Sequence, residues 1–136
     1  MNLKIIDCRK GIEARMNDTS QYDIVFIGNY TKDTISSPAG TRFVDGGGMN
    51  YAANAAARLG LKTAVVTRLA LEDEHVIQGL ESAGIDSFVT YSSSSTLMKL
   101  EYPTTDPDIR TLTVAGTAGS ITARGLYPVQ TRPPGS

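Results

Sequence analysis

The stretch that decides the fold is DGGGMNYAANAAARLGLKTAVV, residues 45–66. Three glycines, residues 46–48, precede an alanine-dense segment of high helix propensity, which is closed by Gly60 as a typical C-terminal stop. A buried strand is expected within residues 63–69, around an apolar run. The stretch therefore predicts a glycine turn, a helix and a strand in succession, with these helix residues at core-facing spacing: Met49, Ala52, Ala53, Ala56 and Leu59.

The segment before the glycines predicts a strand followed by a hairpin. Residues 23–28, DIVFIG, form a continuous apolar run ending in glycine, which is typical of a strand buried on both faces of a parallel sheet. Residues 29–45 are polar, with a turn signal at 36–40 between short β-favouring pieces. We expect a small hairpin on the rim of the sheet there.

The segment after residue 66 predicts a helix over 71–83 and a third strand over 86–91. Strands that alternate with helices through short links indicate right-handed crossovers and a parallel sheet covered by helices, hence an α/β fold. From residue 96 the apolar period becomes two, so strands 96–102 and 110–115 are expected to form an antiparallel hairpin added to the α/β body. Such a hairpin is suited to act as a lid.

Composition excludes several classes of protein. The 136 residues carry 40% apolar side chains and a formal net charge of -1, which favours one globular domain with no electrostatic footprint for nucleic acid. No run is long enough for a membrane span, and no leader is evident at the start. The lone Cys8 and lone His75 leave no zinc cluster and favour a reducing, cytoplasmic setting. We expect residues 1–21 to be an extension and 123–136 an unstructured tail.

Two features are candidates for ligand contact. Bare glycine amides at a helix start approach anions or hydroxyls without obstruction by a Cβ, although a turn that needs positive φ is the alternative explanation. The triplet is neither a P-loop nor a dinucleotide fingerprint. Asp33 lies just beyond the first strand, where open α/β sheets bind ligands, and its alternative is a solvated loop aspartate. The acidic run 72–74 is explained by helix capping, so we assign neither His75 nor Cys8 a catalytic role.

In this order, YDIVFIGNYTKD (22–33), GGGMNYAANAAARLG (46–60) and LKTAVV (61–66) resemble the N-terminal half of PfkB (ribokinase-like) sugar and nucleoside kinases. The resemblance covers about residues 22–122. It implies a Rossmann-type parallel sheet flanked by helices with a small β lid hairpin. The family asparagine of the substrate site falls on Tyr51 without a gap and on Asn50 with a one-residue slip. The residues that the resemblance implies are, for substrate, Asp33, Thr31, Gly46, Gly47, Gly48, Asn50 and Tyr51, and, for the lid, Met98 and Leu100.

The resemblance also implies what the chain does. The parent protein is expected to use ATP and Mg²⁺ to phosphorylate a hydroxyl of a sugar, nucleoside or cyclitol. The family's catalytic aspartate and anion hole belong to a Gly-Ala-Gly-Asp-like motif that this sequence lacks, so we assign no catalytic or metal residue and expect a truncated, inactive chain that retains no cofactor. Self-association through the lid or an exposed sheet edge is expected. The alternatives are a non-enzymatic binding or oligomerisation module built on the lid, and a small Rossmann-like nucleotide binder.

Overall fold

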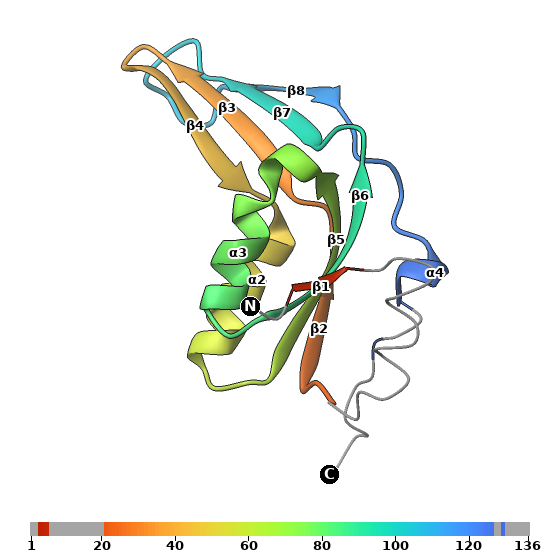
Figure 1. Ribbon diagram of the computed structural model, residues 1–136. Helices are drawn as coiled ribbons and strands as arrows, with labels where there is room; N and C mark the ends of the chain where they lie inside the picture. Colours follow the sequence, from red (N-terminus) through yellow and green to blue (C-terminus); the bar gives the residue numbers. More distant parts are fainter. Residues whose placement is uncertain (1–2, 6–20, 127–128, 130–136) are drawn as a thin grey trace.

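The computed structural model describes residues 3–5, 21–126 and 129, and these form two four-stranded sheets (Figure 1). The first, which we call the core sheet, is entirely parallel and has the order β1-β6-β5-β2. Its strands are β1 (Leu3–Ile5), β2 (Ile24–Ile27), β5 (Thr63–Ala70) and β6 (Asp86–Ser92). The α/β prediction with a parallel sheet is confirmed.

Two helices, α2 (Gly48–Arg58) and α3 (His75–Ser82), pack on one face of the core sheet (Figure 1). Apolar residues of both helices bury against alternate residues of β5 and β6, because successive strand side chains point to opposite faces. The predicted helix 71–83 is divided, with a 3-10 turn, η1 (Leu71–Asp73), before α3. The buried cluster consists of Tyr30, Met49, Ala53, Val65, Leu69, Val76, Ile77, Leu80, Ile85 and Val89.

The other face of the core sheet carries a smaller buried cluster of Tyr22, Ala64, Val66 and Phe88. A short helix, α4 (Ala123–Leu126), packs over β6 on this side, and Leu126 and Val129 contact the cluster. The expectation of no regular structure from residue 123 is therefore wrong for 123–126. Apolar contact with the open sheet face stabilises this turn of helix, which the local sequence does not signal. The rest of the tail lies outside the described residues.

Two further expectations about the core sheet need correction. Strand β2 is an edge strand, paired only with β5 among the described residues, and Ile27 is 54% exposed, so this strand is not buried on both faces. Leu59 is 81% exposed, because α2 ends before it at Arg58. Within the predicted extension, residues 3–5 form strand β1, which pairs with β6. No hydrophobic period in the local sequence indicates this strand. Cys8 lies outside the described residues.

The second sheet, which we call the lid sheet, has the order β4-β3-β7-β8. Its strands are β3 (Thr31–Ser37), β4 (Gly40–Gly46), β7 (Thr96–Glu101) and β8 (Thr111–Gly116). Both predicted hairpins exist, β3–β4 and β7–β8, but they are not separate: β3 pairs with β7 in parallel, from Thr31 opposite Thr96 to Ser36 opposite Glu101. The lid is thus one four-stranded sheet, larger than the predicted hairpin, and it extends beyond the core sheet (Figure 1).

The described helices include none that is both long and apolar enough to cross a membrane.

Candidate functional site

Asp33 and the first glycine of the triplet lie against each other. Strand β3 carries Thr31 and Asp33, and β4 ends at Gly46, which is paired with Thr31. A Cβ at Gly46 would collide with Asp33 Oδ2 and would lie 2.7 Å from Thr31 Oγ1. Only a glycine lets the carboxylate pass this close to the backbone. Two of the sequence-derived candidate regions therefore meet at one place, and Asp33 lies in a strand rather than in a solvated loop.

Gly47 continues the site into the start of α2. Its φ of 102° lies in the region that favours glycine, and a Cβ there would lie 2.8 Å from the backbone oxygen of Asn29. Gly47 is the N-cap of α2, and no side chain caps this end of the helix. Close packing against residues 29–31 thus requires Gly47, while its position at a helix start leaves backbone amides available nearby. Both explanations considered for the triplet, strained turn and ligand contact, are compatible with this geometry.

Two residues that lie against the triplet each carry a buried side-chain oxygen without a hydrogen-bond partner. Asp33 Oδ1 and Asn29 Oδ1 are both inaccessible to solvent and unpaired. The amide nitrogen of the same Asn29 donates to the backbone oxygen of Gly119 at 2.9 Å, which fixes its orientation. Buried polar atoms are paired in the great majority of cases, so unpaired acceptors at a site that a sequence pattern also singles out favour a ligand that brings donors. Sequence reasoning missed Asn29; its place directly after β2 and Gly28 was the available signal.

The lid supplies an apolar surface on the face that carries Asp33. Partners in register share a face of a sheet, so Asp33, Val44 and Met98 lie on one face, and so do Ile35 and Leu100. These four apolar residues are partly buried. The two predicted lid residues, Met98 and Leu100, therefore lie on the same face of the lid sheet as the candidate carboxylate.

Asn50 and Tyr51, the remaining substrate candidates, are placed differently. Asn54 Nδ2 donates to the backbone oxygen of Asn50 at 2.8 Å and to its Oδ1 at 3.1 Å. Asn50 lines a groove of about 260 Å³ between α2 and α3, together with Asp45 and His75. Tyr51 is 61% exposed. Asn50 thus lies in the groove and Tyr51 at the surface, whereas Thr31 and Gly46 lie against Asp33.

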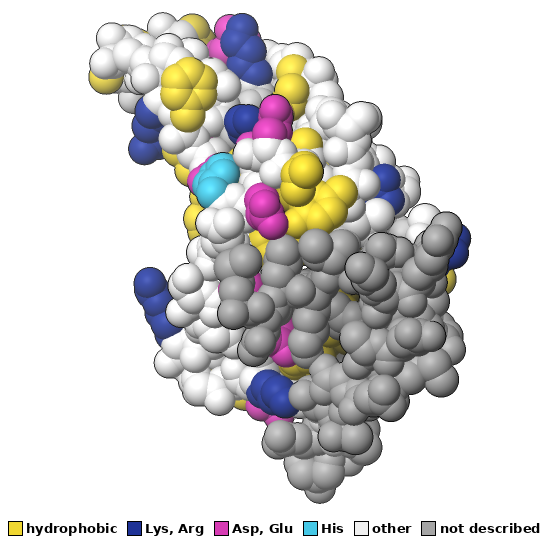
Figure 2. Space-filling view, viewed as in Figure 1, with side chains coloured by type: hydrophobic (Ala, Val, Ile, Leu, Met, Phe, Trp, Pro, Cys, Tyr) yellow, Lys and Arg dark blue, Asp and Glu magenta, His cyan; other side chains and the backbone are white. Residues whose placement is uncertain are grey.

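Asp45 links the lid sheet to α3. The hydroxyl of the buried Tyr30 donates to Asp45 Oδ1 at 2.5 Å, and His75 Nε2 lies 3.1 Å from Asp45 Oδ2. Burial, followed by the hydrogen bond to Asp45, raises the pKa of Tyr30 well above its usual value, so this side chain stays a neutral donor. His75 is exposed at the surface (Figure 2, cyan). Its pairing with Asp45 adds a contact that capping alone does not explain.

Asp73 departs most from expectation. The expectation that helix capping explains the acidic run 72–74 is wrong for Asp73, which is 1% exposed and binds Lys32 and Ser95. Burial tends to raise the pKa of Asp73, and the hydrogen bonds from Ser95 and Lys32 with the lysine charge outweigh it, so the pKa lies below its usual value. Its position just after the carboxyl end of β5 was the signal that sequence reasoning passed over.

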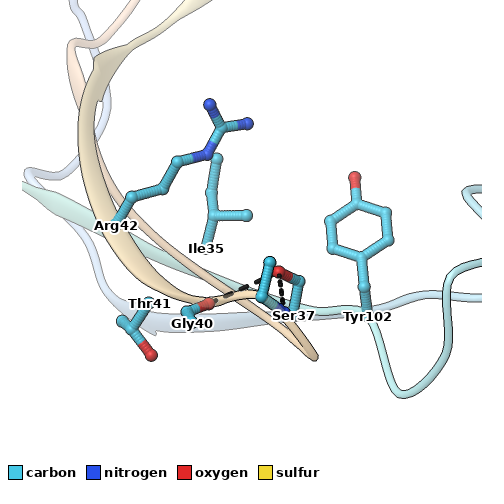
Figure 3. Close-up of a pocket in the computed structure, with 7 residues that line it drawn as sticks. Ile35, Ser37, Gly40, Thr41, Arg42 and Tyr102 are labelled. Carbon is cyan, nitrogen blue, oxygen red and sulfur yellow. Dashed lines mark hydrogen bonds between the residues drawn. The ribbon is translucent and has the colours of Figure 1, made fainter.

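A shallow hollow of about 400 Å³ lies at the tip of the lid and does not include Asp33 or the glycine triplet (Figure 3). The β3–β4 turn forms one side of it, where Ser37 Oγ accepts from the Ala39 amide at 3.3 Å. The hollow is also lined by the side chains of Ile35, Arg42 and Tyr102 (Figure 3). Its open shape and distance from the paired motif residues make it a secondary feature. Among the described residues no cluster of metal-binding side chains is present.

Solved structures of kinases are similar in fold to this chain. No protein-family model matches the chain, and neither does any curated protein. A solved pyrophosphate-dependent kinase in the ribokinase family, in a sulfate complex, is similar with 28% identity and a TM-score of 0.69, covering 76% of this chain and 36% of that one. A pyrophosphate-dependent kinase in the ribokinase family complexed with a pyrophosphate analog and myo-inositol gives 25% identity, a TM-score of 0.67, and coverages of 76% and 35%.

A fructokinase from Halothermothrix orenii, at 19% identity and a TM-score of 0.59, is similar in fold, covering 71% of this chain and 38% of its own. The present chain thus spans a little over a third of the length of these structures.

Proposed function

We propose that this chain, whose fold is that of the ribokinase family, forms the substrate-binding part and the lid of a kinase that phosphorylates a hydroxyl of a sugar, nucleoside or cyclitol. The observation that carries the proposal is the Asp33 carboxylate, which lies against Gly46 with one oxygen buried and unpaired. Supporting it, one of the similar kinases is described with myo-inositol, a small polyol.

The chemistry of the site suits a polyol. An ionised carboxylate only accepts hydrogen bonds, and a substrate with adjacent hydroxyls brings donors to Asp33 Oδ1. Hydrogen bonds to a charged acceptor are stronger than neutral ones, and more so where water is excluded. The apolar lid residues Met98 and Leu100 would exclude water from the bound hydroxyls. Thr31 and the amides following Gly47 would complete the polar contacts.

In this proposal, phosphoryl transfer is carried out by residues outside this sequence. A proton acceptor for the attacking hydroxyl and amides that stabilise the transferred group are needed, and the family's motif for both has no counterpart in the 136 residues. ATP and Mg²⁺ are therefore proposed for the whole protein and not for this chain. Because two similar kinases are described as pyrophosphate-dependent, pyrophosphate is the second donor to test.

Binding calorimetry tests the substrate site. The chain is titrated with myo-inositol, ribose and adenosine, and at least one of them is expected to bind. Asp33→Asn keeps the shape of the side chain and removes its charge, so it should weaken binding by roughly tenfold or more. Asp108→Asn, in the exposed β7–β8 loop, is the matched control and should leave affinity unchanged. Equal losses in both variants, or no binding of any polyol, would contradict the proposal.

A turnover assay tests the inactivity of the chain alone. With Mg²⁺ and either ATP or pyrophosphate, we expect no steady phosphorylation of the polyol that calorimetry identifies. Sustained turnover dependent on protein concentration would show that the chain carries its own catalytic group.

A second candidate function is assembly through the lid. Phe43, Leu112 and Val114 are 81%, 54% and 61% exposed, and β4 and β8 are the edge strands of the lid sheet. Figure 2 shows hydrophobic side chains at the surface of this end of the molecule. Open strand edges with apolar residues favour pairing with another copy. Size-exclusion chromatography with light scattering should show a dimer or larger species that Val114→Lys, on β8, reduces; a monomer at high concentration would reject this function.

A further inference from the structure

A buried carboxylate holds both central strands of the lid where they leave the core. Asp73 lies in η1, directly after β5, and is 1% exposed. Its Oδ1 accepts a hydrogen bond from Lys32 Nζ of β3 at 2.9 Å, and its Oδ2 accepts one from Ser95 Oγ, immediately before β7, at 2.5 Å. Strands β3 and β7 are neighbours in the lid sheet, so a single side chain binds the base of each.

Ser95 is in turn fixed to the core sheet. The backbone amide of Ala70, the last residue of β5, donates to Ser95 Oγ at 2.9 Å. Ser95 is 2% exposed, so both of its hydrogen bonds are shielded from water. Removing one partner from a buried hydrogen-bonded set leaves the others unsatisfied, which makes such sets rigid.

Lys32 connects this anchor to the candidate substrate carboxylate. Lys32 and Asp33 are consecutive in β3, so their side chains point to opposite faces of the lid sheet. Because Lys32 is held to Asp73, the part of β3 that carries Asp33 is tied to the core sheet, while Asp33 lies on the face that carries Met98 and Leu100. The lysine side chain is 45% exposed while that of Asp73 is 2% exposed, so the lysine is the partner that water can replace.

We propose that Asp73 is a positioning residue that fixes the lid sheet on the core sheet through Lys32 and Ser95, and thereby orients Asp33. The role extends beyond substrate binding itself and holds whichever ligand the site takes. A second link, from Tyr30 to Asp45 and from Asp45 to His75, joins the start of α3 to the residue before β3 and to the end of β4. The corner formed by η1 and the start of α3 is thus one place where side chains join the two sheets.

Hydrogen–deuterium exchange with mass spectrometry on the complete chain tests the proposal. In Lys32→Met, the amides of β3 and β7 should exchange roughly tenfold faster, while those of β5 and β6 keep their rates. Lys99→Met is the matched control, because Lys99 lies on the same face of the lid sheet and pairs only within it, with Glu101 at 3.1 Å. That control should leave exchange in both sheets unchanged.

Asp73→Asn and Ser95→Ala should reproduce the pattern of Lys32→Met, and combining Lys32→Met with Asp73→Asn should add little to either alone, because both remove the same contact. Unchanged lid exchange in Lys32→Met, an equal effect of Lys99→Met, or equal acceleration in core and lid would overturn the proposal. If Asp73→Asn does not fold, Lys32→Met and Ser95→Ala still test the proposal. These two variants change only a half-exposed cation and a single hydroxyl, so we expect them to fold.

Discussion

The core sheet and the lid sheet have the same number of strands but are stabilised in different ways. Seven of the eight residues of β5 are buried, and its side chains pack against helices on one face and an apolar cluster on the other. In β8, at the edge of the lid, all but the last residue are exposed. The core is held by apolar burial, whereas the contacts between the lid and the core include polar ones at Asp73 and Asp45.

Because of this difference, the stability of the core and the orientation of the lid depend on different kinds of contact. Burial is non-directional and sums over many residues, so it makes the core stable without dictating where the lid points. Hydrogen bonds and ion pairs contribute less to stability but require particular distances and angles, so they determine orientation. Substitutions in the core should therefore lower the free energy of unfolding, and substitutions at the contacts between the sheets should mainly alter the lid.

The largest expected effect is that of Leu69→Ala in β5. Leu69 is fully buried, so truncation leaves a cavity and should lower the free energy of unfolding by about 2–5 kcal/mol. Urea denaturation followed by circular dichroism measures the change. A loss below about 1 kcal/mol would mean that the core sheet relaxes around the cavity and is less tightly packed than its burial indicates.

Gly46→Ala should have the next largest effect, because the added methyl group meets Asp33 and Thr31 in a closed space. Overpacking of this kind costs about 1–3 kcal/mol. Displacement of the carboxylate should also abolish polyol binding in calorimetry. Gly79→Ala in α3 is the control: nothing lies within 4 Å of its added Cβ, and alanine favours the helix. If Gly46→Ala and Gly79→Ala are equally tolerated, the close approach of Asp33 to Gly46 is not required.

Acid should weaken the contact between the sheets. The pKa of Asp73 is lower in the folded chain than the unfolded value of about 3.9, so its contribution to stability is present above that pH and is lost as pH falls through the folded pKa. Urea midpoints between pH 6 and 2.5 should fall more steeply, below about pH 4, for the parent chain than for Asp73→Asn. Parallel curves for the two proteins would show that Asp73 contributes nothing to the acid sensitivity.

The smallest expected effect is that of Leu112→Ala on β8. The side chain is 54% exposed, so its loss should change the free energy of unfolding by no more than about 0.5 kcal/mol. The measurement is the same urea series, carried out at low protein concentration. A loss comparable to that of Leu69→Ala would indicate that the lid face is covered by another copy in solution.

Local sequence patterns predicted those elements well whose structure is determined by residues within the element itself. The apolar run of β5, the glycine that ends α2 and the turn residues of the β3–β4 hairpin each act within a few positions, and all three elements are present. The family resemblance assigned Asp33 and Gly46, which belong to two separate stretches, to one substrate site, and the two residues lie against each other. The substrate role of these residues stays a prediction.

What the sequence did not reveal depends on partners distant in the chain. The exposure of Ile27 follows from the absence of a second neighbour for β2 among the described strands, and the burial of Asp73 follows from Lys32 and Ser95. Neither can be read from a local period, which reports how a segment alternates but not what covers it. For the same reason, an acidic run at a helix start predicts capping from the sequence alone.

The parallel pairing of β3 with β7 has a consequence for the order of folding. The two hairpins of the lid can each close locally, but Thr31 and Thr96 meet only after the intervening α2, β5, α3 and β6 have been brought together. Contacts between distant residues carry a large loop-closure cost and form slowly. We therefore expect the chain to assemble its central sheet first and to join the two hairpins last, so that the apolar lid face around Asp33, to which β7 contributes Met98, is completed in the final stage.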